Sequence, residues 1–251
     1  MYREARVAVV IPAFCEARIL PRTLRSIPAY VDHIIVVDDG SPDDTYTAAA
    51  ACSLKDPRID LVRMGFNYGV GRAISRGYIR AVELGADVVA VMAADDQMDP
   101  ADLPDLLEPV VTGAADYAKG NRLAHLDSQT MPPVRRMGSR LLARLTGIVA
   151  GLPDLDDAQC GYTAISSAMI GRLPLDDIYP RYGYPNDMIL RLAERGARIQ
   201  QPTVRPVYAD EVSGLRIPNV VVPISGILLR GAFRRLRPRP ESNSALRPAL
   251  R

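Results

Sequence analysis

Several residue types that mark particular protein classes are scarce in this chain. Its 251 residues include three cysteines, two histidines and no tryptophan. Cys15, Cys52 and Cys160 are odd in number and form no Cys-x-x-Cys pair, which argues against a disulfide framework and against a thiolate metal site. His33 and His125 are isolated, and neither has a Ser or Cys partner in a recognisable nucleophile setting. This composition fits a reducing cytoplasm.

Long hydrophobic runs are missing as well. No stretch approaches the roughly 20 apolar residues of a membrane span. The apolar run at residues 7–11 is too short for a signal peptide and is expected to be a first core strand. With 48% hydrophobic and 24% charged residues, the composition excludes disorder and collagen-like repeats. At this length we expect one domain with one sizeable core.

Lysine is the scarce basic residue. Only Lys55 and Lys119 occur, so 29 of the 31 basic residues are arginine, which is suited to bidentate phosphate contacts. The net charge of +2 is unevenly distributed, because residues 230–251 hold seven arginines against Glu241. That tail therefore carries +6 and residues 1–229 carry −4. Nucleic-acid binding by the body of the protein is not expected.

Apolar runs alternate with helical patterns along the chain. The β-branched runs at residues 7–11 and 34–37 end at polar or proline-containing turns, which is typical of buried parallel strands. Further strands are predicted at residues 59–62, 88–92, 117–119, 162–166 and 203–208. Helices are predicted at residues 16–30, 45–52, 72–84, 135–149 and 188–195. The alternation predicts an α/β fold, with an open, mostly parallel, Rossmann-like sheet and helices on both faces.

Ligands of such sheets bind beyond the carboxyl ends of the strands, so the residues that follow each apolar run are informative. They lie at residues 12–16, 38–41, 67–71 and 95–99 and supply carboxylates, glycines and an amide. A dinucleotide-binding enzyme would need Gly-x-Gly-x-x-Gly after the first strand, but Pro-Ala-Phe-Cys-Glu stands there. Gly69-Val-Gly71 lacks the Lys-Ser/Thr of a phosphate loop.

Acidic residues crowd the loop after the fourth strand. Asp95, Asp96, Gln97 and Asp99 repel one another unless they are solvated or paired with a cation, and hard oxygen ligands suit Mg²⁺ or Mn²⁺ beside substrate phosphates. We assign Asp99 to capping of the helix that follows it, because Pro100 comes next. Asp95 and Gln97 lie outside the capping position. The acidic turn at residues 38–43 is either a ligand site or only a turn with an N-cap.

Seven segments in order resemble the family 2 glycosyltransferases of the GT-A fold, most closely the polyprenyl-phosphate (dolichyl-phosphate) mannose and glucose synthases. They lie at residues 9–16, 36–43, 67–73, 92–100, 119–122, 157–162 and 208–213. Any one of them is a weak signal, whereas seven in family order are a strong one. The resemblance covers roughly residues 7–215. It implies a GT-A catalytic domain at residues 1–217, followed by an apolar and basic segment at residues 218–251.

The resemblance also implies a role for individual residues. The nucleotide sugar would lie against Pro12, Phe14, Glu16, Val37, Asp39, Ala94 and Asp95, and the metal would be bound by Asp95 and Gln97. The phosphate of a lipid acceptor would be held by Arg122, Arg135 and Ser139, with Arg205 or Arg216 closing over the site. Asp95, Arg122 and Asp157 are the candidate catalytic residues.

The expected reaction is transfer of a hexose, with inversion, from a nucleotide sugar of the GDP-mannose or UDP-glucose type to a polyprenyl phosphate. A lipid phosphate is already an anion, so arginines position it and Asp157 is an orienting residue. If the acceptor is instead a hydroxyl, Asp157 is the candidate base. The alternatives are a soluble family 2 glycosyltransferase with a hydroxyl acceptor and a non-catalytic nucleotide-sugar binding protein. A nucleotidyltransferase would need a Gly- and Lys-rich loop that is missing.

The sequence departs from the family pattern at three points. Ala93 stands where the family has a carboxylate, which leaves Asp96 as a candidate substitute, and Cys15 replaces a common Asn. The membrane-spanning helices that many relatives carry after the catalytic domain are not expected here. Contact with the cytoplasmic face of a membrane would then rely on residues 218–239, an apolar segment broken by Pro223 and Gly226, and on the basic tail. The alternative for the tail is a solvated extension.

Overall fold

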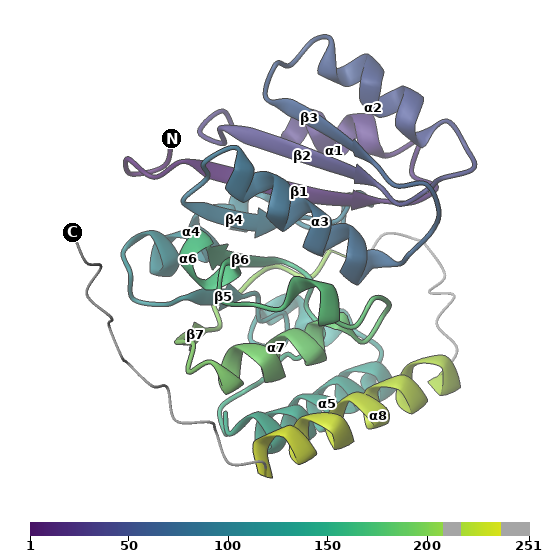
Figure 1. Cartoon of the computed structure of the whole chain (residues 1–251). Helices are drawn as coiled ribbons and strands as arrows, with labels where there is room; N and C mark the ends of the chain where they lie inside the picture. The colour runs from purple at the N-terminus through teal and green to yellow at the C-terminus, as the bar shows by residue number, and fades with distance from the viewer. Residues whose placement is uncertain (208–216, 237–251) are drawn as a thin grey trace, which may run out of the picture.

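A computed structural model describes residues 1–207 and 217–236 of the chain. Its strands are β1 (Val7–Ala13), β2 (His33–Asp38), β3 (Ile59–Arg63), β4 (Val88–Val91), β5 (Tyr117–Lys119), β6 (Thr163–Ser166) and β7 (Ile199–Gln200). Its α-helices are α1 (Leu20–Ser26), α2 (Thr45–Ser53), α3 (Val70–Glu83), α4 (Leu103–Val111), α5 (Pro133–Ala150), α6 (Ser167–Ile170), α7 (Tyr184–Glu194) and α8 (Ile217–Leu236) (Figure 1). Short 3-10 turns are η1 (Pro100–Asp102), η2 (Leu126–Thr130) and η3 (Leu175–Asp177).

The seven strands form one sheet in the order β3-β2-β1-β4-β6-β5-β7. Strands β1 to β4 pair in parallel, whereas β6 runs antiparallel to both β4 and β5. Because β6 is reversed, the loop before it lies at the same edge as the loops that follow β1, β2, β4 and β5. The prediction of an open, mostly parallel sheet is confirmed.

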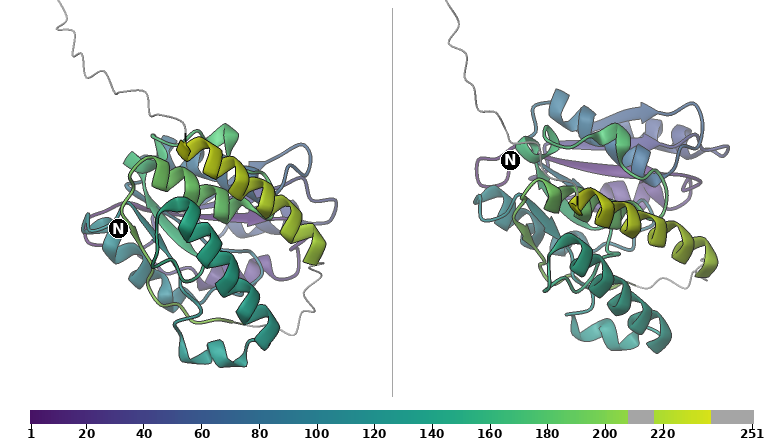
Figure 2. Two further views of the ribbon diagram at one scale, coloured as in Figure 1. Left: turned by 90° about the horizontal axis from the view of Figure 1, so that it is seen from below. Right: turned by 60° about the horizontal axis from the view of Figure 1, so that its bottom comes forward.

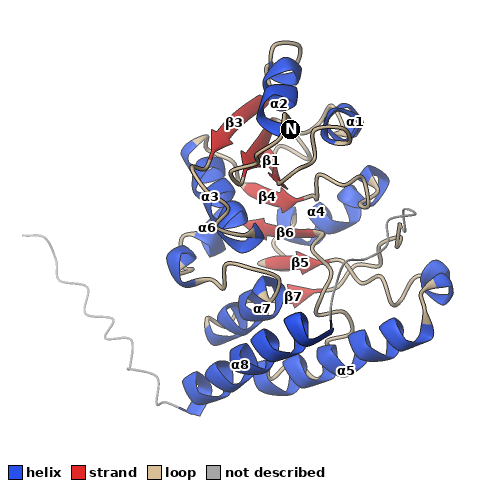
Figure 3. Cartoon of the chain, turned by 90° about the vertical axis from the view of Figure 1, so that its right-hand side faces the viewer, coloured by secondary structure: helices blue, strands red, loops and turns tan. Residues whose placement is uncertain are grey.

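Alternate residues of the strands face two separate cores. On β1, Val7, Val9 and Ile11 pack with α1 and α4, while Ala8 and Val10 pack with α3. Figure 3 shows α3, α6 and α7 on one face of the sheet and α1 and α4 on the other. The β-branched runs are therefore buried on both faces, as expected of parallel strands.

Two predicted elements differ from the structure. The helix predicted at residues 16–30 is limited to α1, because Pro21 stands at its start and Ile27 turns to an extended conformation before Pro28. The strand predicted at residues 203–208 is wrong over its described part. Thr203 makes a single bridge to Asn121, and the ladder stops because Pro206 has no N–H to donate.

Helices α5, α7 and α8 pack together at one end of the sheet (Figures 1 and 3). Although Pro223 and Gly226 interrupt its sequence, α8 is one continuous helix. Ile224 and Ile227 are buried, and Arg234 bridges Asp187 at 3.3 Å and Glu194 at 2.8 Å. The boundary at residue 217 stays a prediction. No helix in the described part of the chain is long and apolar enough to cross a membrane.

Candidate active site

A pocket of about 430 Å³ lies at the carboxyl ends of β1 and β2. One wall is formed by residues that follow strands, and the opposite wall by the segment before α7 and by α8. The lining residues are Pro12, Ala13, Phe14, Asp39, Asn67, Gly69, Val70, Ala73, Tyr179, Arg181, Tyr182, Gly183 and Pro223. Three of the residues predicted for the nucleotide sugar, Pro12, Phe14 and Asp39, are thus brought together.

Asp39 connects two loops of this pocket. Its carboxylate oxygens accept hydrogen bonds from the backbone N–H groups of Tyr68 at 2.9 Å and Gly69 at 2.8 Å. Burial raises the pKa of Asp39, although these two bonds and the charge of Arg181 act in the opposite direction. The neighbouring Asp38 instead accepts from Ser41 N, within the turn. The two adjacent aspartates therefore serve different purposes, one for the turn and one for the pocket.

The two glycines of the Gly69-Val-Gly71 segment permit a close approach of backbones. A Cβ at Gly69 would lie 2.5 Å from the Pro180 carbonyl oxygen, and one at Gly71 would lie 2.2 Å from that of Tyr179. Gly69 also has a φ of 101°. The glycines hold the start of α3 against the opposite wall of the pocket, which is a packing role.

A smaller pocket of about 170 Å³ adjoins the first and shares Pro12, Val70 and Tyr182 with it. Ala93 and Met98, from the acidic loop after β4, also line it. The remaining lining residues are Ile74, Val91, Gln159, Gly161, Tyr184 and Pro185. The acidic loop therefore borders the second pocket.

Within the acidic loop the four polar residues have different partners. Asp95 Oδ1 accepts from Gln97 N at 3.1 Å, and both side chains are half-buried. Asp96, with a φ of 59°, forms an ion pair with Arg22 at 2.9 Å. Asp99 accepts from Ala101 N at the start of η1, so its predicted capping role is confirmed. Ala94 lies in the core, and its carbonyl accepts from Thr23 Oγ1 at 3.0 Å.

Arg122, after β5, forms a two-pronged ion pair with Asp157, from the loop before β6. Arg122 Nε and Nη2 lie 2.8 and 3.2 Å from the two carboxylate oxygens. Asp157 is fully buried and also accepts from the N–H groups of Gln159 and Cys160. Burial alone would raise the pKa of Asp157, but the charge and hydrogen bonds of Arg122 outweigh it, so the pKa lies below its usual value.

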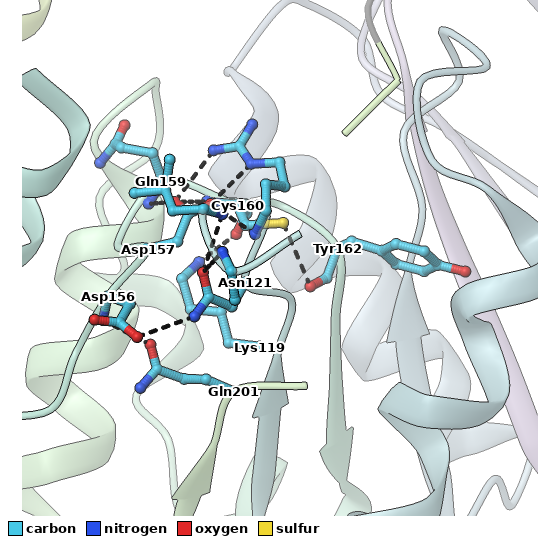
Figure 4. A network of polar contacts seen from close by, with 11 residues as sticks. Lys119, Asn121, Asp156, Asp157, Gln159, Cys160, Tyr162 and Gln201 are labelled. Carbon is cyan, nitrogen blue, oxygen red and sulfur yellow. Dashed lines mark hydrogen bonds and ion pairs between the residues drawn. The ribbon is translucent and has the colours of Figure 1, made fainter. Parts of the chain in front are cut away.

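Lys119 lies beneath this ion pair and is fully buried (Figure 4). Its ammonium group donates to the Cys160 carbonyl oxygen. Burial lowers the pKa of Lys119 to about 8, against the opposing influence of Cys160 and Asp157. Asn121, from the same segment, donates to Asp156 at 3.1 Å. The loop before β6 is thus fixed to the end of β5 by several polar contacts.

The residues predicted for the acceptor lie in three places. Arg135 and Ser139 stand one turn apart at the start of α5. The charges of Arg135 and Arg122 both lower the pKa of Tyr182, which burial raises. Arg205 is exposed and forms an ion pair with Asp127 at 3.1 Å. Arg216 lies outside the described residues.

Four of the residues predicted for the nucleotide sugar do not line either pocket: Glu16, Val37, Ala94 and Asp95. Val37 is fully buried in the core beneath it. Glu16 lies in the loop after β1, where its N–H donates to Thr45 Oγ1 at 2.8 Å. Glu16 lies two positions after Phe14, and Val37 lies two positions before Asp39, in the sequence. Their predicted roles stay predictions.

Sequence reasoning missed the wall at residues 179–183. Its only signal is a cluster of three tyrosines and two prolines at residues 179–185 in an aromatic-poor chain. It also missed a buried polar chain that starts in the smaller pocket. Gln159 Nε2 donates to Asn186 Oδ1 on α7, and Asn186 Nδ2 donates to Thr146 Oγ1 on α5 at 2.7 Å.

Residues 8–168 match the model of glycosyl transferase family 2, and the chain belongs to that family. It is 32% identical to the undecaprenyl-phosphate mannosyltransferase of Micrococcus luteus, over 93% of this chain and 98% of that protein. It is 28% identical to the polyprenol monophosphomannose synthase of Mycolicibacterium smegmatis, over 92% and 90% of the two chains.

Solved structures give the same fold. Glucosyl-3-phosphoglycerate synthase from Mycobacterium tuberculosis, in complex with Mn²⁺, UDP and glucosyl-3-phosphoglycerate, superposes with a TM-score of 0.72. The match covers 92% of this chain and 81% of that chain at 20% identity. The GT-A architecture expected from the sequence is therefore confirmed, and the protein is a glycosyltransferase.

Proposed function

We propose that the protein transfers a hexose from a nucleotide sugar, of the GDP-mannose or UDP-glucose type, to a polyprenyl phosphate at the cytoplasmic face of a membrane. The observation that carries the proposal is Arg122, which is held by Asp157 at 2.8 Å and whose charge, with that of Arg135, acts on Tyr182, a lining residue of both pockets. Similarity over nearly the full length to an undecaprenyl-phosphate mannosyltransferase supports the same acceptor class.

The larger pocket is assigned to the nucleoside. Its lining is mostly apolar, and Phe14 presents a partly exposed ring on which a base can stack. The Asp39 carboxylate lies there to accept from a ribose hydroxyl, while Arg181 is the nearby cation for a phosphate. The smaller pocket, which continues from the first, is assigned to the sugar.

Asp95 and Gln97 would hold Mg²⁺ or Mn²⁺ at the diphosphate. Among residues 1–207 and 217–236 no group of three or more His, Cys, Asp or Glu side chains is placed to bind a metal. One carboxylate and one amide fit a cation that completes its shell with substrate phosphates and water. Asp96 does not replace the carboxylate missing at Ala93, because it pairs with Arg22. When bound, the metal would neutralise the charge that develops on the leaving diphosphate.

The acceptor side of the site supports attack by a phosphate oxygen. That oxygen forms a bond to the anomeric carbon while the bond from this carbon to the diphosphate breaks, so the configuration inverts and the nucleoside diphosphate leaves. Arg122, Arg135 and Ser139 would orient the acceptor phosphate. No proton has to be removed. Asp157 is a poor base because both its oxygens accept hydrogen bonds and its pKa is lowered, so we assign it to orienting Arg122.

The test is a panel of labelled GDP- and UDP-hexoses incubated with Mg²⁺ or Mn²⁺ and either a polyprenyl phosphate or water-soluble sugars. We expect label in the organic phase with the polyprenyl phosphate. Label confined to the aqueous phase would instead identify a hydroxyl acceptor. Tight donor binding by calorimetry, without metal and without turnover, would identify a non-catalytic binding protein.

A further inference from the structure

Helix α5 carries a second apolar face that nothing in the described structure covers. Its residues recur at intervals of three or four and are between 44% and 71% exposed: Val134, Met137, Leu141, Leu145 and Ile148. The side of α5 that packs on the protein is formed instead by Ala143, Thr146 and Gly147. A helix of a soluble protein normally turns its apolar stripe to the core. Here the larger apolar side chains face away from it.

Helix α8 adds to the same end of the molecule. Leu229 and Phe233 lie one turn apart and are 62% and 68% exposed, on the side opposite the buried Ile224 and Ile227. Figure 2 shows α5 and α8 side by side when the molecule is seen from below. Arg235 joins them by donating to two carbonyl groups in the last turns of α5, at 2.9 and 3.1 Å. The two exposed rows together are named the docking face.

The charged residues of α5 and α8 themselves have one sign, although Arg234 is paired with Asp187 and Glu194 of α7. Helices α5 and α8 hold seven arginines and no aspartate or glutamate. By helical position, Arg140 and Arg144 flank the apolar row of α5 on one side and Arg135 on the other. Aliphatic side chains flanked by arginines are complementary to a bilayer with anionic headgroups, where the apolar row enters the acyl boundary and the guanidinium groups meet phosphates.

We propose that the docking face binds an anionic lipid bilayer. This inference rests on the proposed function, because a bilayer would bring the lipid acceptor to the site. Arg135, which is assigned to the acceptor phosphate, lies in the first turn of α5. Pro223 of α8 lines the larger pocket, so the helix that borders the donor pocket also carries part of the docking face. Docking therefore sets the mouth of the site at the headgroup level, where the phosphate of a polyprenyl lipid lies.

The test is sedimentation of the full chain with vesicles of phosphatidylcholine alone or mixed with phosphatidylglycerol. We expect binding to the mixed vesicles that weakens with salt. The double variant Leu141→Gln/Ile148→Gln should bind about tenfold more weakly, because two side chains no longer enter the acyl boundary. The matched control is Leu54→Gln, an 89% exposed leucine after α2, which should bind like the wild type. Urea unfolding checks that all three chains are equally folded.

Equal vesicle binding by the double variant and the wild type would overturn the proposal. The proposal would also be overturned if the wild type were a dimer, the double variant a monomer, and vesicle binding unchanged. The docking face would then bind a second copy of this chain. Transfer to a short-chain, water-soluble polyprenyl phosphate separates the two proposals. If that transfer occurs but vesicles are not bound, docking is wrong and the proposed function stands. If vesicles are bound but no transfer occurs, the proposed function is wrong and the docking proposal stands.

Discussion

Two adjacent aspartates in the loop after β4 form a natural matched pair. Asp95 Oδ1 accepts from Gln97 N within its own loop at 3.1 Å, whereas Asp96 forms an ion pair with Arg22 at 2.9 Å. We expect Asp95→Asn to lower kcat at least a hundredfold, since it removes the carboxylate assigned to the metal. Asp96→Asn should keep activity within about twofold, because Asn tolerates the positive φ at this position.

Transfer rates at graded Mg²⁺ or Mn²⁺ concentrations measure this difference, after chelation with EDTA. An Asp95→Asn enzyme with normal turnover and normal metal dependence would refute the metal assignment. Loss of activity in Asp96→Asn alone would assign the metal to Asp96.

Asp157 distinguishes an orienting carboxylate from a base. Asp157→Asn leaves Arg122 without its buried counter-charge, so we expect the free energy of unfolding to fall by about 3 kcal/mol and the KM for the acceptor to rise. The acidic limb of the pH–rate profile should stay as in the wild type. Disappearance of that limb in the variant would mean that Asp157 is the base.

The difference in free energy of unfolding between the wild type and Asp157→Asn should depend on pH. The pKa of Asp157 is lower in the folded protein than in the unfolded chain. Its contribution is therefore complete above the unfolded value of about 4 and is lost as the pH falls through the folded pKa. Urea unfolding from pH 8 to pH 3 tests this.

Lys119 predicts a second pH dependence, which has the same sign as that of Asp157 but occurs at alkaline pH. Its pKa is about 8 in the folded protein, against the ordinary value of 10.5 for a lysine in the unfolded chain. Between these values the unfolded chain binds more protons, so stability rises with pH, by about 3 kcal/mol in total. Lys119→Met lacks this titration. From pH 8 to pH 10.5 the free energy of unfolding of the wild type should therefore increase relative to that of the variant. Parallel curves of the two proteins against pH would show that Lys119 has the same pKa in the folded and unfolded chains.

Helix α3 packs tightly on β1 at Gly77, whereas α5 has free space at Gly138. A Cβ at Gly77 of α3 would lie 2.3 Å from Val10 Cγ1, whereas one at Gly138 of α5 meets nothing within 4 Å. Gly77→Ala should lower the free energy of unfolding by about 1 to 3 kcal/mol. Gly138→Ala should raise it by up to about 1 kcal/mol, because alanine favours the helix. Urea unfolding of both variants measures the contrast, and equal effects would contradict it.

Elements with a local cause could be predicted from the sequence, whereas contacts between distant segments could not. The β-branched run at residues 34–37 predicts β2 because burial on both faces leaves no room for polar side chains. The strand expected at residues 203–208 is wrong over its described part because Pro206 outweighs its apolar pattern.

The same limit applies to the site. The place of Asp39 after a strand left open whether it is a ligand or part of a turn, and only the family resemblance assigned it to the nucleotide; the structure places it in the lining of the larger pocket. Arg181 and Tyr182 complete the pocket from a loop without periodicity, brought there by packing that no local pattern encodes. The pairing of Arg122 with Asp157 likewise depends on the reversal of β6, which places a preceding loop at the edge formed by following loops.

On the scale of the whole molecule, α8 sets where the basic tail can be removed. Arg234 and Arg235 fasten the end of α8 to α7 and α5, so a cut near residue 229 would damage the fold. Deletion of residues 237–251 removes four arginines and one glutamate. We expect unchanged stability and about tenfold weaker binding to anionic vesicles at low salt. Unchanged vesicle binding would leave the tail without a role in membrane attachment.

The polar chain from Gln159 through Asn186 to Thr146 joins the smaller pocket, which we assign to the sugar, to α5, the helix that carries the exposed apolar row. If the donor and a bilayer bind as proposed, these hydrogen bonds connect the two binding sites. Thermodynamic reciprocity makes the exchange symmetrical: the factor by which a bilayer changes donor affinity equals the factor by which the donor changes bilayer affinity. The ratio of donor affinities measured with and without vesicles therefore gives the factor by which the donor changes the affinity of the protein for the membrane.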